Sequence, residues 1–183
     1  KIYYGAPGTG KSFEIDQMIE NENIPDENVF RTTFHPEFTY SDFIGQLLPT
    51  VKEDEDGNTS ITYTFNKGVF TQAIEKAYLD TAIKIYLVLE EMSRGDVAAI
   101  FGDTFQLLDR FNFGLKKGYS RYSINNDVIS KDIFSIIGNK VKLPPNLLIY
   151  GTVNTSDQNV FVMDTAFKRR FEWEYISTKP VES

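Results

Sequence analysis

The run from Gly5 to Ser12 (GAPGTGKS) contains the residue types that bind the phosphates of a nucleotide. It fits the pattern of a glycine, four variable residues, and then Gly-Lys-Ser or Gly-Lys-Thr. Glycines let the backbone turn its N–H groups toward an anion, and a helix starting at Lys11 would add the positive end of its dipole. The predicted nucleotide-binding residues are Gly5, Ala6, Pro7, Gly8, Thr9, Gly10, Lys11, Ser12 and Phe13.

Two of these residues have side chains that suit a more specific task. We expect the Lys11 ammonium to reach the β- and γ-phosphates, and the Ser12 hydroxyl to hold Mg²⁺. The alternative, a glycine-rich turn that matches the pattern by chance, is disfavoured because the run lies between an expected strand and an expected helix.

Two acids, Glu90 and Glu91, directly follow the apolar run at residues 85–89 (IYLVL). Ligands of parallel sheets bind beyond the carboxyl ends of the strands, so these acids are expected to face the phosphate-binding loop. Glu90 would then support Mg²⁺ through water, and Glu91 would polarise the attacking water. Two solvent-facing acids without a chemical role remain the alternative interpretation.

Asn154 follows a second apolar run, at residues 147–153, in the same way. If both strand ends meet, Asn154 and Glu91 can contact one water molecule. An amide suits that position because it can both donate to a phosphate and accept from water. A turn cap is the alternative role for this residue.

A basic segment, Lys168–Arg170, follows residues 164–167 (DTAF). The planar, permanently charged fork of arginine can clamp a developing phosphoryl charge, which makes Arg169 and Arg170 catalytic candidates. The local sequence alone favours a simpler role, in which basic residues complement the dipole at a helix end.

The order of apolar patterns predicts an α/β fold: a three-layer α/β/α nucleotide-binding core with a mainly parallel five-stranded sheet and a β-hairpin insertion. Expected strands cover residues 2–4, 28–34, 61–65, 85–89, 147–153 and 171–176, and expected helices cover 11–22, 70–78, 97–108 and 163–170. A further short helix, capped by Ser41, would carry Phe43, Ile44, Leu47 and Leu48. The acidic residues 53–58 are interpreted as a hairpin turn, and residues 114–142 as an insertion that forms a hairpin.

Composition restricts the classes of protein to consider. The 183 residues suffice for one domain, 1–183, and no apolar run reaches the roughly 20 residues that span a bilayer. There are no cysteines, which fits a reducing compartment, so a cytoplasmic location is expected. The net charge of −7 makes the domain a poor general binder of nucleic acid. Because the chain opens directly before the phosphate-binding loop, we expect it to be a piece of a longer protein.

Five segments in this order resemble the AAA+ family, and within it the McrB branch, the motor subunits of modification-dependent restriction systems. Besides the loop at 5–12, they are residues 34–44 (FHPEFTYSDFI), 87–94 (LVLEEMSR), and 153–157 (VNTSD) followed by 164–171 (DTAFKRRF). The resemblance covers nearly the whole chain. It implies Mg²⁺ as cofactor and GTP or ATP as substrate.

The resemblance also implies roles for single residues. Asn154 becomes a sensor of the γ-phosphate, and Arg169 or Arg170 an arginine finger supplied to a neighbour's nucleotide. A homo-oligomeric ring, a hexamer by expectation, follows from such a finger, and Arg94 would also face the neighbour. The single histidine, His35, is interpreted as structural. Three residues depart from the family pattern: Glu90 replaces an aspartate, Ser156 an alanine and Gln158 an arginine. The resemblance also leads us to expect that the helical lid of the family would follow residue 183.

Three functions are compatible with these motifs. The first is a Mg²⁺-dependent motor of a McrB-like restriction system that hydrolyses a nucleoside triphosphate and translocates DNA for a partner nuclease. The second is a remodelling ATPase of the MoxR or dynein-related kind, which acts on protein. The third is a nucleotide-gated assembly module with little turnover. Contact with DNA could come from Lys116, Lys117 and Arg121, which are interleaved with Tyr119 and Tyr122; a solvated hairpin is the alternative.

Overall fold

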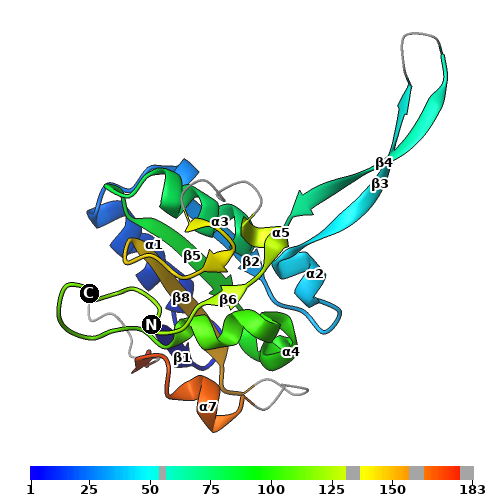
Figure 1. Ribbon diagram of the computed structural model, residues 1–183. Helices are drawn as coiled ribbons and strands as arrows, with labels where there is room; N and C mark the ends of the chain where they lie inside the picture. The colour runs from blue at the N-terminus through cyan, green and yellow to red at the C-terminus, as the bar shows by residue number, and fades with distance from the viewer. Residues whose placement is uncertain (54–56, 131–136, 157–162, 178–183) are drawn as a thin grey trace.

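The computed structural model describes residues 1–53, 57–130, 137–156 and 163–177 (Figure 1). Its centre is a five-stranded sheet with the order β2-β5-β8-β1-β9, in which every neighbouring pair is parallel. The strands are β1 (Ile2–Gly5), β2 (Val29–Thr33), β5 (Ile85–Glu90), β8 (Leu147–Asn154) and β9 (Trp173–Tyr175). The predicted parallel five-stranded sheet is confirmed.

Both faces of the sheet are covered, which gives the predicted three layers. On one face, Ile15 and Ile19 of α1 (Lys11–Asn21) belong to a buried cluster with side chains of β1 and β5. On the other face, α3 (Val69–Leu79) and α4 (Val97–Phe101) contribute to a larger buried cluster. All six residues of β5 are buried, as expected for an interior strand between two helical layers.

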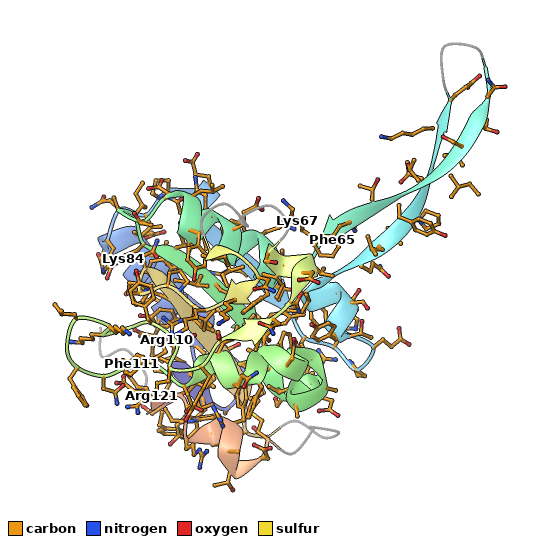
Figure 2. The ribbon with its side chains drawn as sticks, viewed as in Figure 1. Phe65, Lys67, Lys84, Arg110, Phe111 and Arg121 are labelled. Carbon is orange, nitrogen blue, oxygen red and sulfur yellow. The ribbon has the colours of Figure 1, made fainter. Side chains whose placement is uncertain are left out.

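A long antiparallel hairpin extends from the body of the domain (Figure 1). It consists of β3 (Gly45–Glu53) and β4 (Thr59–Lys67), paired along their whole length. The pairing of Glu53 with Thr59 agrees with a hairpin at this place, and residues 54–56 of the turn predicted at 53–58 lie outside the described residues. At the base of the hairpin, near Phe65 in Figure 2, Lys67 forms an ion pair of 2.8 Å with Glu75 of α3.

The helix predicted after Ser41 is wrong in its extent. Helix α2 covers only Tyr40–Phe43, and its N-cap is Thr39, whose hydroxyl accepts from the Asp42 backbone N–H. Gly45 has a φ of 125°, which ends the helix and starts β3. Leu47 and Leu48 therefore lie in a strand and are exposed. Their helical spacing from Phe43 misled the prediction.

The insertion at 114–142 is also less regular than the predicted hairpin. Its strands, β6 (Ile124–Asn125) and β7 (Lys140–Val141), have two residues each, with α5 (Asp127–Ser130) between them. Within the described ranges, the remaining elements are three 3₁₀ helices, η1 (Asp26–Asn28), η2 (Met92–Arg94) and η3 (Gly102–Leu108), and the short helix α7 (Thr165–Lys168). In the part of the chain that the structure describes, no helix is long and apolar enough to cross a membrane.

Candidate active site

The loop between β1 and α1 wraps around the ammonium group of Lys11. Gly8 and Gly10 have φ angles of 77° and 86°, in the left-handed region that glycine enters most easily. Lys11 is only 6% exposed. Its Nζ donates to the carbonyl oxygens of Ala6 at 2.8 Å and Gly5 at 3.3 Å. The predicted loop residues therefore do form one compact turn at the start of a helix.

Glu90 lies at the carboxyl end of β5, directly beside this loop. The Ser12 hydroxyl donates to Glu90 Oε2 at 2.9 Å, which joins the start of α1 to the end of β5. Oε2 also accepts from the Thr152 hydroxyl at 2.5 Å, and Oε1 accepts from Arg31 at 2.9 Å. With 8% exposure, the carboxylate is fixed by donors from three elements. The predicted proximity of Glu90 and Ser12 is thus found.

Glu91, the next residue, has an unusual backbone. Its φ of 55° and ψ of 40° place it in the left-handed region, where a non-glycine residue costs about 1–2 kcal/mol. Its backbone N–H donates to the Thr152 hydroxyl at 3.0 Å. Its carboxylate accepts from Asn154 Nδ2 at 2.5 Å. Backbone strain of this kind is concentrated at functional sites, because only surrounding contacts can hold it.

Asn154 and Glu91, which were predicted to meet on one water molecule, contact each other directly. Asn154 is the last residue of β8 and is paired in register with Gly5 of β1. The two strand ends thus place an amide and a carboxylate together at the edge of the sheet where the phosphate-binding loop begins.

Sequence reasoning missed two residues of this site. Thr152 bridges the two acids, since its hydroxyl donates to Glu90 and accepts from the Glu91 N–H. Its place two residues before Asn154, on the same face of a strand, was the available signal. Arg31 pairs with both Glu90 and Asp16, and no sequence signal pointed to it, because its role depends on β2 lying beside β5.

The donor set fits a hard divalent cation. A hydroxyl and a carboxylate oxygen, on Ser12 and Glu90, lie 2.9 Å apart, and oxygen ligands are those that Mg²⁺ prefers. Among the described residues, no three His, Cys, Asp or Glu side chains gather as a metal site. A metal here would therefore need oxygens from phosphate and water to complete its coordination, which is how Mg²⁺ is commonly held beside nucleotides.

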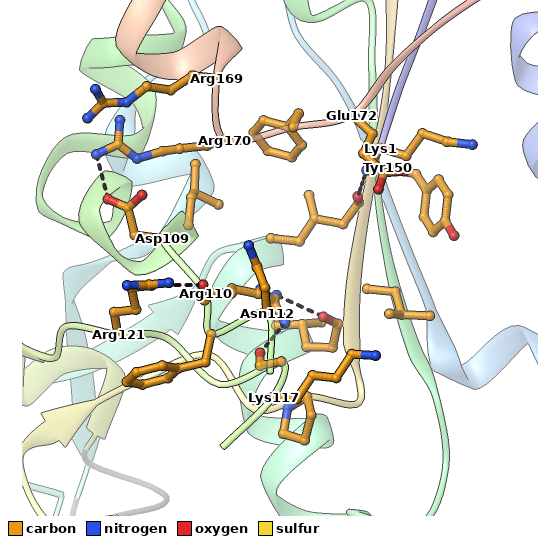
Figure 3. A pocket seen from close by; sticks show the side chains of 18 of the residues that line it. Lys1, Asp109, Arg110, Asn112, Lys117, Arg121, Tyr150, Arg169, Arg170 and Glu172 are labelled. Atoms are coloured by element: carbon orange, nitrogen blue, oxygen red, sulfur yellow. Dashed lines mark hydrogen bonds and ion pairs between the residues drawn. The ribbon is translucent and has the colours of Figure 1, made fainter. Parts of the chain in front are cut away.

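The two arginine candidates have different surroundings. Arg170 donates to Asp109 at 2.8 Å and to the Ala166 carbonyl at 2.6 Å, and its guanidinium lies 4.2 Å from the centre of the Phe105 ring. Its side chain is 9% exposed. Arg169 is exposed, and its side chain makes no hydrogen bond or ion pair to any residue in the described ranges, although its backbone N–H donates to the Thr165 carbonyl at 3.1 Å. The side chain of Arg170 is therefore held by contacts within its own chain, whereas that of Arg169 is exposed (Figure 3).

Neither arginine lies at the phosphate-binding loop of its own chain. Both line a separate cleft, to which none of residues 5–13 contributes. Of the remaining candidates, Arg94 and Phe13 are exposed. Ser156 is also exposed, whereas Gln158 lies outside the described residues.

Comparison with known proteins gives the following relatives. A family model described as AAA domain (dynein-related subfamily) matches residues 2–171. The Type II restriction enzyme BsuMI component YdiS of Bacillus subtilis is 35% identical over 200 residues, covering 96% of this chain and 56% of the relative. The Type IV methyl-directed restriction enzyme EcoKMcrB subunit of Escherichia coli is 24% identical over 176 residues, covering 94% of this chain and 34% of the relative.

A crystal structure of a proposed ATPase from Cytophaga hutchinsonii has a TM-score of 0.52 at 14% identity, covering 99% of this chain and 42% of that one. This likeness supports the fold. The chain spans between a third and just over half of the length of the curated relatives it matches.

Proposed function

The chain belongs to the AAA domain family, dynein-related subfamily, and to its McrB branch, and from this premise we propose that it hydrolyses GTP or ATP with Mg²⁺ as the motor of a restriction system. The observation that carries the proposal is the hydrogen bond between Ser12 of the phosphate-binding loop and Glu90. It joins the phosphate-binding loop to a pair of acids. The loop alone would support nucleotide binding, whereas the loop and the acids together support hydrolysis.

Each residue of the site has a defined task in this reaction. The N–H groups of the loop and the Lys11 ammonium bind the β- and γ-phosphates. Ser12 would hold Mg²⁺ directly and Glu90 would hold it through water, and the ion would supply positive charge against the phosphates. Glu91 orients and polarises the attacking water as general base. Asn154 holds the Glu91 carboxylate in place through the 2.5 Å hydrogen bond and can donate to the γ-phosphate.

A homo-oligomeric ring, which we propose to be a hexamer, would complete the site. Stabilisation of the transferred phosphoryl group benefits from an arginine, and Arg31, which contacts Glu90 of the same chain, is already paired with two acids. The exposed Arg169 fits a finger that acts on a neighbour's nucleotide. The names of the relatives, both components of restriction enzymes, support a nuclease partner and DNA translocation as proposals.

Phosphate release from GTP and ATP, measured side by side with Mg²⁺ and with EDTA, tests the proposed reaction. We expect Mg²⁺-dependent release from one or both nucleotides. Glu91→Gln should lower it at least about 100-fold, the low end of what a general base contributes, with nucleotide affinity retained. The exposed Glu37→Gln is a matched control and should release phosphate like the wild type. Equal release by the wild type and Glu91→Gln would refute the role of Glu91.

Two observations each support an alternative function for this site. The matching family model is the dynein-related one, which favours a remodelling ATPase that acts on protein. Turnover stimulated by a protein substrate, and not by DNA, would identify it. The internal hydrogen bonds of Glu90 favour an assembly module with little turnover. Nucleotide-dependent oligomerisation without phosphate release would identify that module.

A further inference from the structure

Arg31, in the middle of β2, contacts two carboxylates that belong to two different elements. Its Nη1 donates to Glu90 Oε1 at 2.9 Å, and its Nη2 donates to the carboxylate of Asp16 on α1. The side chain of Asp16 is 49% exposed, that of Arg31 35% and that of Glu90 11%. The three charged groups therefore form a row that leads from the solvent-facing side of α1 to the buried end of β5.

The strand register and the helix period bring these side chains together. Arg31 is paired in register with Val88, which is two residues before Glu90 on β5. Residues two apart on a strand share a face, and Val88 packs in the cluster that α1 covers, so Glu90 lies on the same face of the sheet. Ser12 and Asp16 are four residues apart on α1 and so lie on one side of the helix. Helix α1 thus reaches Glu90 twice, directly through Ser12 and indirectly through the contact of Asp16 with Arg31.

The two oxygens of the Glu90 carboxylate have separate partners. Oε2 accepts from the Ser12 hydroxyl at 2.9 Å and from the Thr152 hydroxyl at 2.5 Å, whereas Oε1 accepts from Arg31. The last torsion of a glutamate side chain has a broad energy minimum, so contacts to a single oxygen leave the carboxylate plane free to turn. The contact with Arg31 restricts this turning, because it fixes the second oxygen.

An opposite effect of Arg31 on a cation has to be weighed against this one. A positive charge beside the proposed metal site would repel Mg²⁺. Asp16 offsets that charge, however, because its carboxylate pairs with the same guanidinium. We therefore expect the orientation of Glu90, rather than the charge of Arg31, to decide the effect on metal binding.

We infer that Arg31 is a positioning residue for the metal-binding carboxylate, with Asp16 as its anchor. Arg31 fixes Glu90 in the orientation in which the carboxylate and Ser12 can hold Mg²⁺ together. The acid at this position must then be a glutamate, since a side chain one methylene shorter would not reach Arg31 and the two hydroxyl groups at once. The inference rests on the proposed function in one respect, that Mg²⁺ binds with the nucleotide at Ser12 and Glu90.

Calorimetry with a non-hydrolysable nucleoside triphosphate, in Mg²⁺ and in EDTA, tests the inference on the purified protein. Arg31→Met should weaken the affinity in Mg²⁺ by about 2- to 12-fold, as expected when one additional side chain must be immobilised on binding. The affinity in EDTA should not change, because Arg31 does not contact the nucleotide. A loss of the same size in both conditions would instead indicate a general disturbance of the fold and would overturn the inference.

Double variants test whether the three charged groups act in series. Asp16→Asn should weaken the affinity in Mg²⁺ in the same direction as Arg31→Met. The variant Asp16→Asn/Arg31→Met should be no weaker than Arg31→Met, because Asp16 acts through Arg31. Likewise, Glu90→Asp/Arg31→Met should be no weaker than Glu90→Asp. Additive losses in either pair would overturn the inference.

Lys84→Met is the matched control, because it removes the same charge from another contact between α1 and the sheet. Lys84 directly precedes β5 and pairs at 2.7 Å with Glu22, the residue that caps the far end of α1. The nucleotide affinity of this variant should equal that of the wild type, both in Mg²⁺ and in EDTA. Urea denaturation establishes that all variants are folded.

Two further results would overturn the inference. One is an Arg31→Met variant whose affinity in Mg²⁺ equals or exceeds that of the wild type, since relief of charge repulsion would then dominate. The other is a Lys84→Met variant that loses as much affinity as Arg31→Met.

Phosphate release by the wild type separates this test from that of the proposed function. If the wild type releases phosphate and Arg31→Met keeps its full affinity in Mg²⁺, the inference alone fails. If the predicted losses of affinity occur but the wild type releases no phosphate, the proposed reaction fails and the role of Arg31 stands.

Discussion

Replacing Thr152 by valine removes one hydroxyl from the centre of the site and keeps the shape of the side chain. Thr152 is buried, and its hydroxyl donates to Glu90 at 2.5 Å and accepts from the Glu91 N–H at 3.0 Å. A hydrogen bond to a charged group contributes about 1.5–3 kcal/mol, and a buried N–H left unpaired costs about 1–3 kcal/mol. Ser12 and Arg31 still donate to Glu90, so we expect a loss of about 3 kcal/mol in the free energy of unfolding.

The same substitution should lower turnover, because Glu91 loses a contact that holds its left-handed backbone. If misplacement of the Glu91 carboxylate raises the activation barrier by about 1.4–2.7 kcal/mol, the rate of turnover decreases about ten- to a hundredfold. Urea denaturation and Mg²⁺-dependent phosphate release measure the two effects.

Thr50→Val is the control, since Thr50 is exposed on the hairpin and its hydroxyl donates to that of Thr64 at 3.3 Å, its one hydrogen bond to a described residue. It should change stability by no more than about 0.5 kcal/mol. If Thr152→Val matches this control in both assays, the bridging role of Thr152 is refuted.

Three further predictions concern single side chains. Arg170→Ala should lower the free energy of unfolding by about 2 kcal/mol in urea denaturation, because it breaks a largely buried ion pair with Asp109. Arg169→Ala should leave the free energy of unfolding unchanged and should lower turnover only under conditions in which the protein self-assembles. Lys11→Ala should weaken triphosphate binding more than tenfold by calorimetry; an unchanged affinity would contradict the phosphate role. The hydrogen bond from Lys84 holds the pKa of Glu22 below its ordinary value of 4.5, so the ionised form stabilises the fold above that pH. The higher thermal midpoint of wild type over Glu22→Gln should therefore be full at pH 7 and disappear as the pH falls below about 4.5.

The strands of the sheet were predictable because continuous apolar runs are typical of strands buried on both faces. The loop at 5–12 and the acids after β5 were predictable for a related reason, since the carboxyl ends of parallel strands meet at one edge. No local sequence pattern predicted the strand order β2-β5-β8-β1-β9. Arg31 belongs to the site only through that order, so its contact with Glu90 could not be foreseen.

In two other places, the local sequence did not reveal contacts that form only in the folded chain. Phe43, Ile44, Leu47 and Leu48 have helical spacing, but Gly45 and the pairing with β4 turn the last two into strand residues. Arg169 and Arg170 look equivalent in the sequence. They differ because Asp109, 61 residues away, lies against Arg170 in the folded chain.

A double-mutant cycle on Ser12→Ala and Glu90→Gln, measured as the affinity for a non-hydrolysable nucleoside triphosphate by calorimetry, tests most directly whether loop and acid hold one metal ion. With Mg²⁺, we predict that the two substitutions are coupled by at least about 1 kcal/mol, as expected for groups with a shared partner. In EDTA the coupling should disappear. Strictly additive losses with Mg²⁺, or the same coupling in EDTA, would contradict the metal site between Ser12 and Glu90.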